Sequence, residues 1–246
     1  MNIAGVEIGP GHPCRTVAEL SNASNGDLDR ALRICEAARE AGADFLKLQC
    51  YSPQELVELR GDGPAPEPWG SNGWTMRRLY EKAATPYRHV MEVAKACDDI
   101  GLPWFSSVFG AGSLALLEAL DCPAYKLAAL DYDQRKLRKM VEGTGKPVLR
   151  SSPHEKPPAG FALWCPPGYP QTSFNLREAM KRYPGFSYHG TDPFVPALAA
   201  AYGAQLVEVH FQLNDEPSEL EANVSLTASQ FRDMVGMIRR AEAVAT

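Results

Sequence analysis

Short apolar runs alternate with amphipathic stretches along the chain. Residues 43–50 (ADFLKLQC) form the clearest run, bounded by a glycine turn and a Ser-Pro pair, and this pattern predicts a strand. Strand side chains alternate between two faces, so Phe45, Lys47 and Gln49 share one face. Because a buried ammonium without a partner is costly, Lys47 is expected either to form a core salt bridge or to point into a site that holds an anion.

The same alternation predicts eight strands, at residues 16–21, 43–50, 102–109, 124–130, 147–152, 161–165, 186–190 and 205–211. Amphipathic helices are predicted at residues 28–41, 76–83, 85–100, 113–120, 134–142, 174–182, 193–202 and 228–243. Residues 153–160 contain three prolines, so no helix is expected after the fifth strand. Alternating strands and helices point to a (β/α)8 TIM barrel, with a doubly wound open sheet as the alternative. Neither a GxGxxG nor a GxxxxGK[ST] motif supports that alternative.

Two segments fall outside the repeat. Residues 1–15 are rich in Gly and Pro and are predicted to form a hairpin before the main fold. Residues 51–76 form a long polar insertion of the kind that is functional or disordered. Residues 16–246 are predicted to be one barrel domain.

Composition limits the classes of function. A chain of 246 residues that is 45% hydrophobic and 22% charged suits one α/β domain of barrel size, or two small ones. With a net charge of −5, the chain lacks the excess of basic residues that is typical of nucleic-acid-binding proteins. No apolar run predicts a membrane span or a secretory signal. The six cysteines have no CxxC spacing, so we expect reduced, buried thiols in a cytoplasmic enzyme.

Polar side chains gather at the ends of the predicted strands, where the chemistry of such barrels occurs. Alternation places these residues toward the lumen: Glu19, Ser21, Lys47, Gln49, Ser107, Lys126, Ser151, Glu208 and His210, with Asp131 in the loop after the fourth strand. Lys47 and Lys126 with serine hydroxyls suit a phosphate or carboxylate clamp. The alternative is that Glu19 and Glu208 pair with these lysines.

Several motifs resemble one family. They are AEL at Glu19, NGDL at residues 25–28, AGADFLKLQ, FSSVF, CPAYKLAAL, GKPVLRSS, VEVHF, VSLTASQFRDMV and the N-terminal IGPGHP. Together they resemble the sialic acid synthase family, which includes the pseudaminic and legionaminic acid synthases, in order over nearly the whole chain. The resemblance implies a (β/α)8 barrel that condenses phosphoenolpyruvate with an N-acylated aldose, helped by a divalent metal (Mn²⁺, Mg²⁺ or Co²⁺).

The resemblance also implies roles for particular residues. The residues with implied catalytic roles are Glu19, Lys47, Lys126 and Glu208. Those with implied substrate contacts are Gln49, Ser107, Ser151, Tyr169, Asp131 and Glu221, with Lys47 and Lys126 also holding phosphoenolpyruvate. His210 matches one metal histidine. The second falls at Thr191, so His189, two residues away on the same strand parity, or Asp192 is expected to replace it.

The departures from the family's pattern concern the metal and sugar sides of the site. Residues 23–26 read ASNG without the family's histidine, and Cys165-Pro166-Pro167 lacks a polar ligand of the sixth strand. The chain ends at Thr246, so no C-terminal antifreeze-like domain is expected. In the family, the partner's copy of that domain supplies an arginine. A homodimer is left open.

Three functions are consistent with this combination of retained and altered family residues. The first is a transferase that condenses phosphoenolpyruvate with an aldose to give a 2-keto-3-deoxy sugar acid, with an altered acceptor. The second is a barrel enzyme of another class, an aldolase or lyase, that retains the anion clamp. The third is a non-catalytic binding relative in a nucleotide-sugar pathway. Both lysines are present, which favours a retained anionic ligand.

Overall fold

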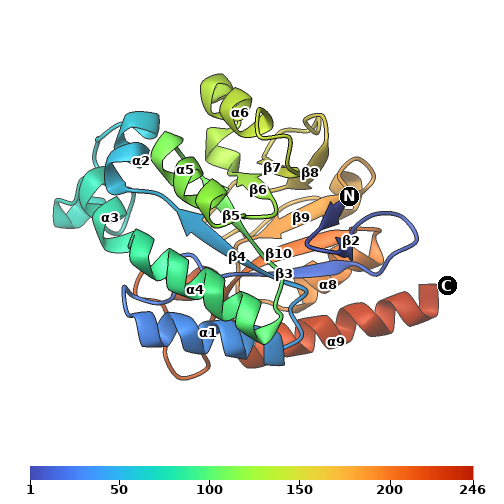
Figure 1. Ribbon diagram of the computed structural model, residues 1–246. Helices are drawn as coiled ribbons and strands as arrows, with labels where there is room; N and C mark the ends of the chain where they lie inside the picture. The colour runs from blue at the N-terminus through green and yellow to red at the C-terminus, as the bar shows by residue number, and fades with distance from the viewer. Residues whose placement is uncertain (246) are drawn as a thin grey trace.

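A computed structural model describes residues 1–245 and contains a closed ring of eight parallel strands (Figure 1). The ring order is β3 (Arg15–Glu19), β4 (Phe45–Cys50), β5 (Trp104–Val108), β6 (Tyr125–Leu127), β7 (Val148–Ser152), β8 (Phe161–Trp164), β9 (Gly185–Tyr188) and β10 (Leu206–Gln212). Strand β10 pairs with both β9 and β3, which closes the ring. The prediction of a (β/α)8 barrel is therefore confirmed, and the open-sheet alternative is wrong.

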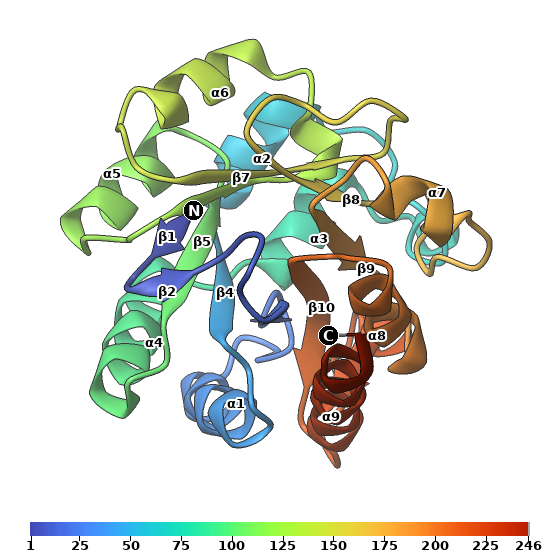
Figure 2. The same cartoon turned by 90° about the vertical axis from the view of Figure 1, so that its right-hand side faces the viewer.

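Helices cover the outside of the ring (Figures 1 and 2). They are α1 (Leu28–Glu40), α2 (Pro53–Arg60), α3 (Met76–Ala83), α4 (Tyr87–Ile100), α5 (Ala111–Ala119), α6 (Arg135–Glu142), α7 (Leu176–Met180), α8 (Phe194–Ala201) and α9 (Ala228–Ala245). As predicted, β7 runs to β8 without a helix between them in the described chain. Among residues 1–245, none of these helices has the length and apolar character needed to cross a membrane.

Two apolar layers lie on the outer and inner sides of the strand ring. The larger layer lies between the ring and the helices and includes Leu46 and Leu48. The smaller layer fills the ring at the N-terminal ends of the strands, where Phe45 and Phe105 meet edge to face at 5.7 Å between ring centroids. This division confirms the predicted alternation, since Phe45 points inward and its neighbours outward.

The N-terminal hairpin closes one end of the barrel, as Figure 2 illustrates. Strands β1 (Asn2–Ile3) and β2 (Val6–Glu7) pair antiparallel through a turn whose two residues both have positive φ. Ile3 and Ile8 from this hairpin are fully buried in the inner apolar layer. The polar residues of the lumen therefore face the opposite, C-terminal end.

The long insertion differs most from expectation. Instead of an irregular loop, it contains helix α2 and a short 3-10 turn at Gly70–Asn72. Ser52 and Glu55 form a capping box at the start of α2, since each side chain accepts a hydrogen bond from the other residue's backbone N–H. A further strand, β11 (Ser225–Thr227), extends the sheet beside β10 and was not predicted.

Candidate functional site

Two lysine–glutamate pairs fill the lumen at the C-terminal ends of the strands. Strand register places Glu19 of β3 directly beside Lys47 of β4, and Lys47 Nζ forms an ion pair with Glu19 Oε2. On the other side, Lys126 Nζ donates to both carboxylate oxygens of Glu208, each at 2.9 Å. Glu208 Oε1 also lies 3.7 Å from Lys47 Nζ. The two pairs are thus joined into one buried network, and the salt-bridge alternative for these lysines is realised in this structure.

Hydroxyl and amide groups complete the network. Ser107 Oγ accepts a hydrogen bond from Lys47 Nζ at 3.1 Å, and Ser187 Oγ donates to Glu208 Oε1 at 3.0 Å. The backbone N–H of Ser21 donates to Glu19 Oε1 at 2.8 Å. Ser187 was missed by sequence reasoning, although it shares the parity of His189 on the weakest predicted strand.

Two other predicted contact residues also lie at this end of the barrel. Gln49 Nε2 donates to Ser21 Oγ at 3.0 Å, next to Glu19. Ser151 is buried, and its hydroxyl has no hydrogen-bond partner within residues 1–245. A buried hydroxyl without a partner is costly, so Ser151 is suited to a ligand.

The pKa values of the two lysines shift in opposite directions. Burial opposes the charge of Lys47, but the carboxylates of Glu19 and Glu208 outweigh burial and raise the pKa of Lys47. Burial lowers the pKa of Lys126, which faces one carboxylate and is repelled by Lys47. Burial would raise the pKa of Glu208, yet the two lysines lower it to about 2. Glu208 is therefore ionised at neutral pH, and Lys126 is the lysine that loses its proton more readily.

A second cluster lies beside the first and joins four predicted residues. The rings of His189 and His210 are 5.0 Å apart between centroids. Glu221 links the cluster, because Oε2 lies 3.2 Å from His210 Nδ1 and Oε1 accepts a hydrogen bond from Tyr169 at 2.6 Å. The ring of Tyr169 lies 4.9 Å from that of His189. The structure therefore brings Tyr169, His189, His210 and Glu221 together.

The two histidines have opposite electrostatic environments. Burial and the neighbouring His210 lower the pKa of His189 to about 3, so this ring is neutral. Burial also opposes the charge of His210, but Glu221 outweighs it and raises the pKa of His210. Despite its burial, Glu221 has a pKa of about 2, chiefly because of His210. His210 and Glu221 thus form an ion pair when the imidazole is protonated.

Gln171 fixes the orientation of His189. The backbone N–H of His189 donates to Gln171 Oε1 at 3.0 Å, while Gln171 Nε2 donates to Pro166 O at 2.7 Å and lies 3.2 Å from His189 Nδ1. With Nδ1 facing an amide donor, the neutral ring carries its proton on Nε2. Sequence reasoning missed Gln171 because it lies in a Pro-rich segment without periodicity.

The residues predicted to bind a metal are only partly brought together. Asp192 is exposed, and its Oδ1 accepts the backbone N–H of Phe194 at 2.9 Å at the start of α8. Across residues 1–245, no group of three or more His, Cys, Asp or Glu side chains is arranged to hold a metal ion. A divalent ion would therefore have only His189 and His210 as nitrogen ligands, with substrate or water completing its coordination. His189 would first have to move its proton to Nδ1.

Asp131 is engaged by a residue of the insertion. Its carboxylate accepts from Arg60 Nε at 2.8 Å and from Arg60 Nη2 at 2.6 Å, and the Asp131 side chain is fully buried. The Arg60 guanidinium lies over the ring of Phe109 at 5.3 Å. This bidentate pair holds the end of α2 against the loop after β6. Arg60 was not predicted as part of the site.

The sequence and fold are similar to those of known proteins. The NeuB family model matches residues 34–155 and 171–246. The pseudaminic acid synthase of Helicobacter pylori is 30% identical over 254 residues, covering 93% of this chain and 74% of that protein. The pseudaminic acid synthase of Campylobacter jejuni is 29% identical over 255 residues, covering 92% and 73%. The crystal structure of N-acetylneuraminic acid synthetase from Leptospira borgpetersenii has a TM-score of 0.85 at 20% identity, covering 100% of this chain and 89% of that one, which agrees with the barrel fold.

Proposed function

The chain belongs to the NeuB family, and from this we propose that it is a sugar acid synthase that condenses phosphoenolpyruvate with an aldose. The product would be a 2-keto-3-deoxy sugar acid. Relatives named as pseudaminic acid synthases, about 30% identical over nearly the whole chain, support this class of enzyme.

The observation that carries the proposal is the pair of buried lysines at the C-terminal end of the barrel. Lys47 and Lys126 lie in one network with Ser107 and both glutamates. An ammonium has three donors, and Lys126 directs two of its contacts to Glu208, so a donor is left for a phosphate or carboxylate oxygen. Ser151, with its unpartnered hydroxyl, offers a further donor.

The proposed reaction forms one carbon–carbon bond and releases phosphate. C3 of phosphoenolpyruvate attacks the carbonyl carbon of the aldose, whose oxygen takes up a proton, and positive charge develops at C2. Glu19, held by the backbone of Ser21, stabilises this charge and orients a water molecule that adds to C2. The added water loses one proton, which balances the proton taken up by the aldose oxygen. The hydroxyl left on C2 then gives its proton to the departing phosphate as the bond between C2 and the phosphate oxygen breaks, which leaves the 2-keto acid. Lys47 and Lys126 balance the charge of the phosphate and carboxylate throughout.

The aldose would occupy the histidine side of the lumen. Tyr169, Glu221 and Gln49 present hydroxyl, carboxylate and amide groups of the kind that bind sugar hydroxyls. A divalent metal at His189 and His210 stays a prediction. When bound, such an ion would polarise the carbonyl oxygen of the aldose. The charges of Lys47, Lys126, Glu19 and Glu208 sum to zero, so a bound cation would also offset the added charge of phosphoenolpyruvate.

Phosphate release and ligand binding test the proposal together. We expect release of phosphate from phosphoenolpyruvate that depends on one member of a panel of aldoses, with Mn²⁺ present. We also expect millimolar phosphoenolpyruvate to raise the melting temperature of the protein and of Lys136→Ala, an exposed control, but not of Lys126→Met. The absence of both phosphate release and thermal protection in the unmodified protein would overturn the proposal.

One observation favours a second candidate, an aldolase that forms a Schiff base. Burial and the charge of Lys47 lower the pKa of Lys126, which makes this amine the better nucleophile of the two. Attack of the Lys126 amine on a ketone would form an imine and release water. Borohydride reduction in the presence of pyruvate would then give a stable adduct on Lys126 in the aldolase, and none in the proposed synthase.

A further inference from the structure

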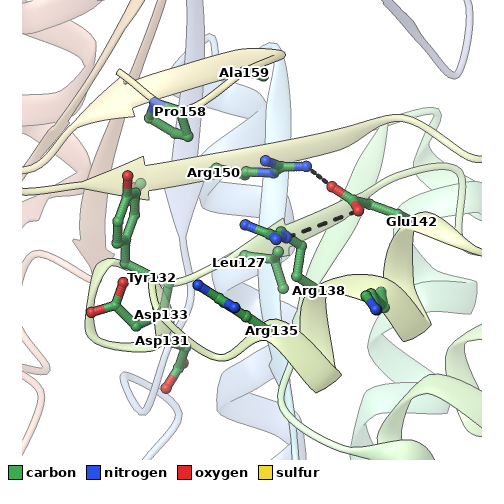
Figure 3. Close-up of a pocket in the computed structure, with 13 residues that line it drawn as sticks. Leu127, Asp131, Tyr132, Asp133, Arg135, Arg138, Glu142, Arg150, Pro158 and Ala159 are labelled. Atoms are coloured by element: carbon green, nitrogen blue, oxygen red, sulfur yellow. Dashed lines mark ion pairs between the residues drawn. The ribbon is translucent and has the colours of Figure 1, made fainter. Parts of the chain in front are cut away.

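A cavity of about 680 Å³ lies on the outside of the barrel, between α6 and the loop that replaces a helix after β7 (Figure 3). Leu149 of β7 packs into the inner apolar layer, so its neighbour Arg150 points outward into the cavity. Ser151 follows on the same strand and also borders the cavity. Arg150 thus faces away from the lumen, and the cavity reaches the C-terminal end of β7 at Ser151.

The cavity is lined by an excess of cationic side chains. Arg135, Arg138 and Lys139 lie on one face of α6, at helical spacings of three and four residues, and Arg150 of β7 lines the same cavity. Arg138 and Arg150 share a single carboxylate, that of Glu142. Figure 3 shows Arg135 and Arg138 extending from α6 into the space beside Arg150.

Two of these cations form no ion pair in the described part of the chain. Neither Arg135 nor Lys139 forms an ion pair within residues 1–245, and both are exposed to the cavity's solvent. Asp131 and Asp133 also border the cavity: Arg60 takes both oxygens of Asp131, and Asp133 forms no ion pair with a residue of the described chain. The pKa of Arg150 is lowered first by burial and second by the charge of the neighbouring Arg138. An anion bound here would relieve this crowding of like charge.

The remaining walls suit the body of a small molecule. Leu127 and Pro158 contribute apolar surface, and Tyr132 stands at the edge with its ring 4.6 Å from that of His154. The volume lies in the range of small-molecule sites. The match to the NeuB family is interrupted between residues 155 and 171, which include Pro158 and Ala159 of the cavity wall. One wall is therefore built by a segment that lies outside the match to the family model.

We propose that this outer cavity binds a phosphate ester of sugar size, with the phosphate on Arg135, Arg138 and Lys139 and the carbon skeleton against Leu127 and Pro158. Arginine forks and lysine point charges are the groups that recognise phosphate oxygens. The cationic groups proposed to hold the phosphate come from α6, and none of them is a residue proposed to hold phosphoenolpyruvate, although Ser151 borders both spaces.

Calorimetric titration with glucose 6-phosphate tests this site, with glucose as the uncharged probe. We expect the double variant Arg135→Ala/Lys139→Ala to bind glucose 6-phosphate about tenfold more weakly, since two charge-assisted contacts are lost. The control Lys95→Ala/Lys136→Ala removes the same charge from exposed positions outside the cavity and keeps the affinity of the unmodified protein. Saturating phosphoenolpyruvate is expected to leave the titration unchanged.

Three results would overturn the proposal. One is the absence of glucose 6-phosphate binding to the unmodified protein at millimolar concentration. The second is equal weakening in the two double variants, which would mean that only the net charge matters. The third is displacement of glucose 6-phosphate by phosphoenolpyruvate, which would place both ligands in the lumen. A protein that binds glucose 6-phosphate but releases no phosphate from phosphoenolpyruvate would retain this site while losing the proposed function.

Discussion

Lys126 Nζ lies 2.9 Å from each carboxylate oxygen of Glu208, and both side chains are buried. These residues are 82 positions apart and come from strands on opposite sides of the barrel ring. Their contact therefore crosses the lumen. An anion that bound in the lumen would therefore have to open or share this charged pair.

The first prediction concerns the energetic coupling of this pair. Lys126→Met leaves Glu208 with only the more distant Lys47 as a cation, so we expect a loss of about 3 kcal/mol in the free energy of unfolding. Glu208→Gln should cost a similar amount. The double variant should lose clearly less than the sum, because no buried charge is left without its partner. Urea unfolding of the four proteins measures this coupling, and additive losses would contradict it.

The second prediction concerns acid stability. The pKa values of Glu208 and Glu221 are about 2 in the folded protein, against an ordinary value of 4.5. As the pH falls, these two carboxyls therefore bind protons at a higher pH in the unfolded chain than in the folded protein. The stabilising contribution is present above pH 4.5 and is lost as pH falls toward 2, on the order of 1–3 kcal/mol for each carboxyl.

Urea unfolding between pH 6 and pH 3 measures this loss. Glu221→Gln removes one of the two titrating carboxyls, so its stability should fall less steeply over that range than the stability of the unmodified protein. Glu36→Gln, at an exposed position of α1, serves as the control and should keep the original slope. Parallel slopes for all three proteins would show that Glu221 titrates normally.

The third prediction concerns the thiols. All six cysteines are buried, and burial raises the pKa of Cys50 and Cys122 to about 12 and that of Cys165 to about 11. Thiolate is the reactive form, so the native protein should react with an aromatic disulfide reagent at pH 8 only as fast as it unfolds. All six thiols should react at once in urea. Rapid reaction of even one thiol in the native protein would disprove this expectation.

The fourth prediction concerns the start of α2. Glu55 accepts hydrogen bonds from the backbone of Ser52 and Ser113, both at 2.9 Å, and from the hydroxyl of Tyr87 at 2.6 Å. Glu55→Ala leaves these donors without an acceptor, so we expect a loss of about 2 kcal/mol in unfolding free energy. Glu58→Ala, exposed on the same helix, should cost less than a quarter of that. Thermal denaturation compares the two variants.

The fifth prediction concerns the metal. If His189 and His210 hold Mn²⁺, electron paramagnetic resonance should detect one bound ion per chain, and His210→Ala should abolish its binding. Asp192→Ala should bind Mn²⁺ as the unmodified protein does, because Asp192 is exposed and caps the start of α8. Unchanged Mn²⁺ binding in His210→Ala would exclude this pair as the ligands.

Local pattern was enough to predict most of the barrel. Alternation along residues 43–50 correctly placed Phe45 and Lys47 toward the lumen and the leucines toward the helices. This was possible because the two faces of a buried parallel strand contact different layers of the protein. The prolines of 153–160 correctly predicted a missing helix. Helix α2 was not predicted although Ser52 and Glu55 have capping-box spacing, because the many Gly and Pro residues of the same segment are typical of loops.

The contacts that orient the site could not be read from local pattern. Arg60 and Asp131 are 71 positions apart, and their pairing depends on how α2 folds back over the barrel. Gln171 reaches His189 through a Pro-rich segment that has neither helical nor strand periodicity. The outer cavity likewise depends on which face of α6 turns toward β7, and this is decided by packing of Leu137 and Val141.

The buried hairpin residues Ile3 and Ile8 make the barrel a blind-ended chamber. Ligands that react in the lumen must then enter and leave by the same end. A molecule seated deepest, against Lys47 and Lys126, has to arrive before any molecule that sits nearer the mouth. Such a chamber imposes an order on arrival and departure, so for the reaction proposed above, steady-state kinetics with two substrates should follow a sequential ordered scheme with phosphoenolpyruvate first.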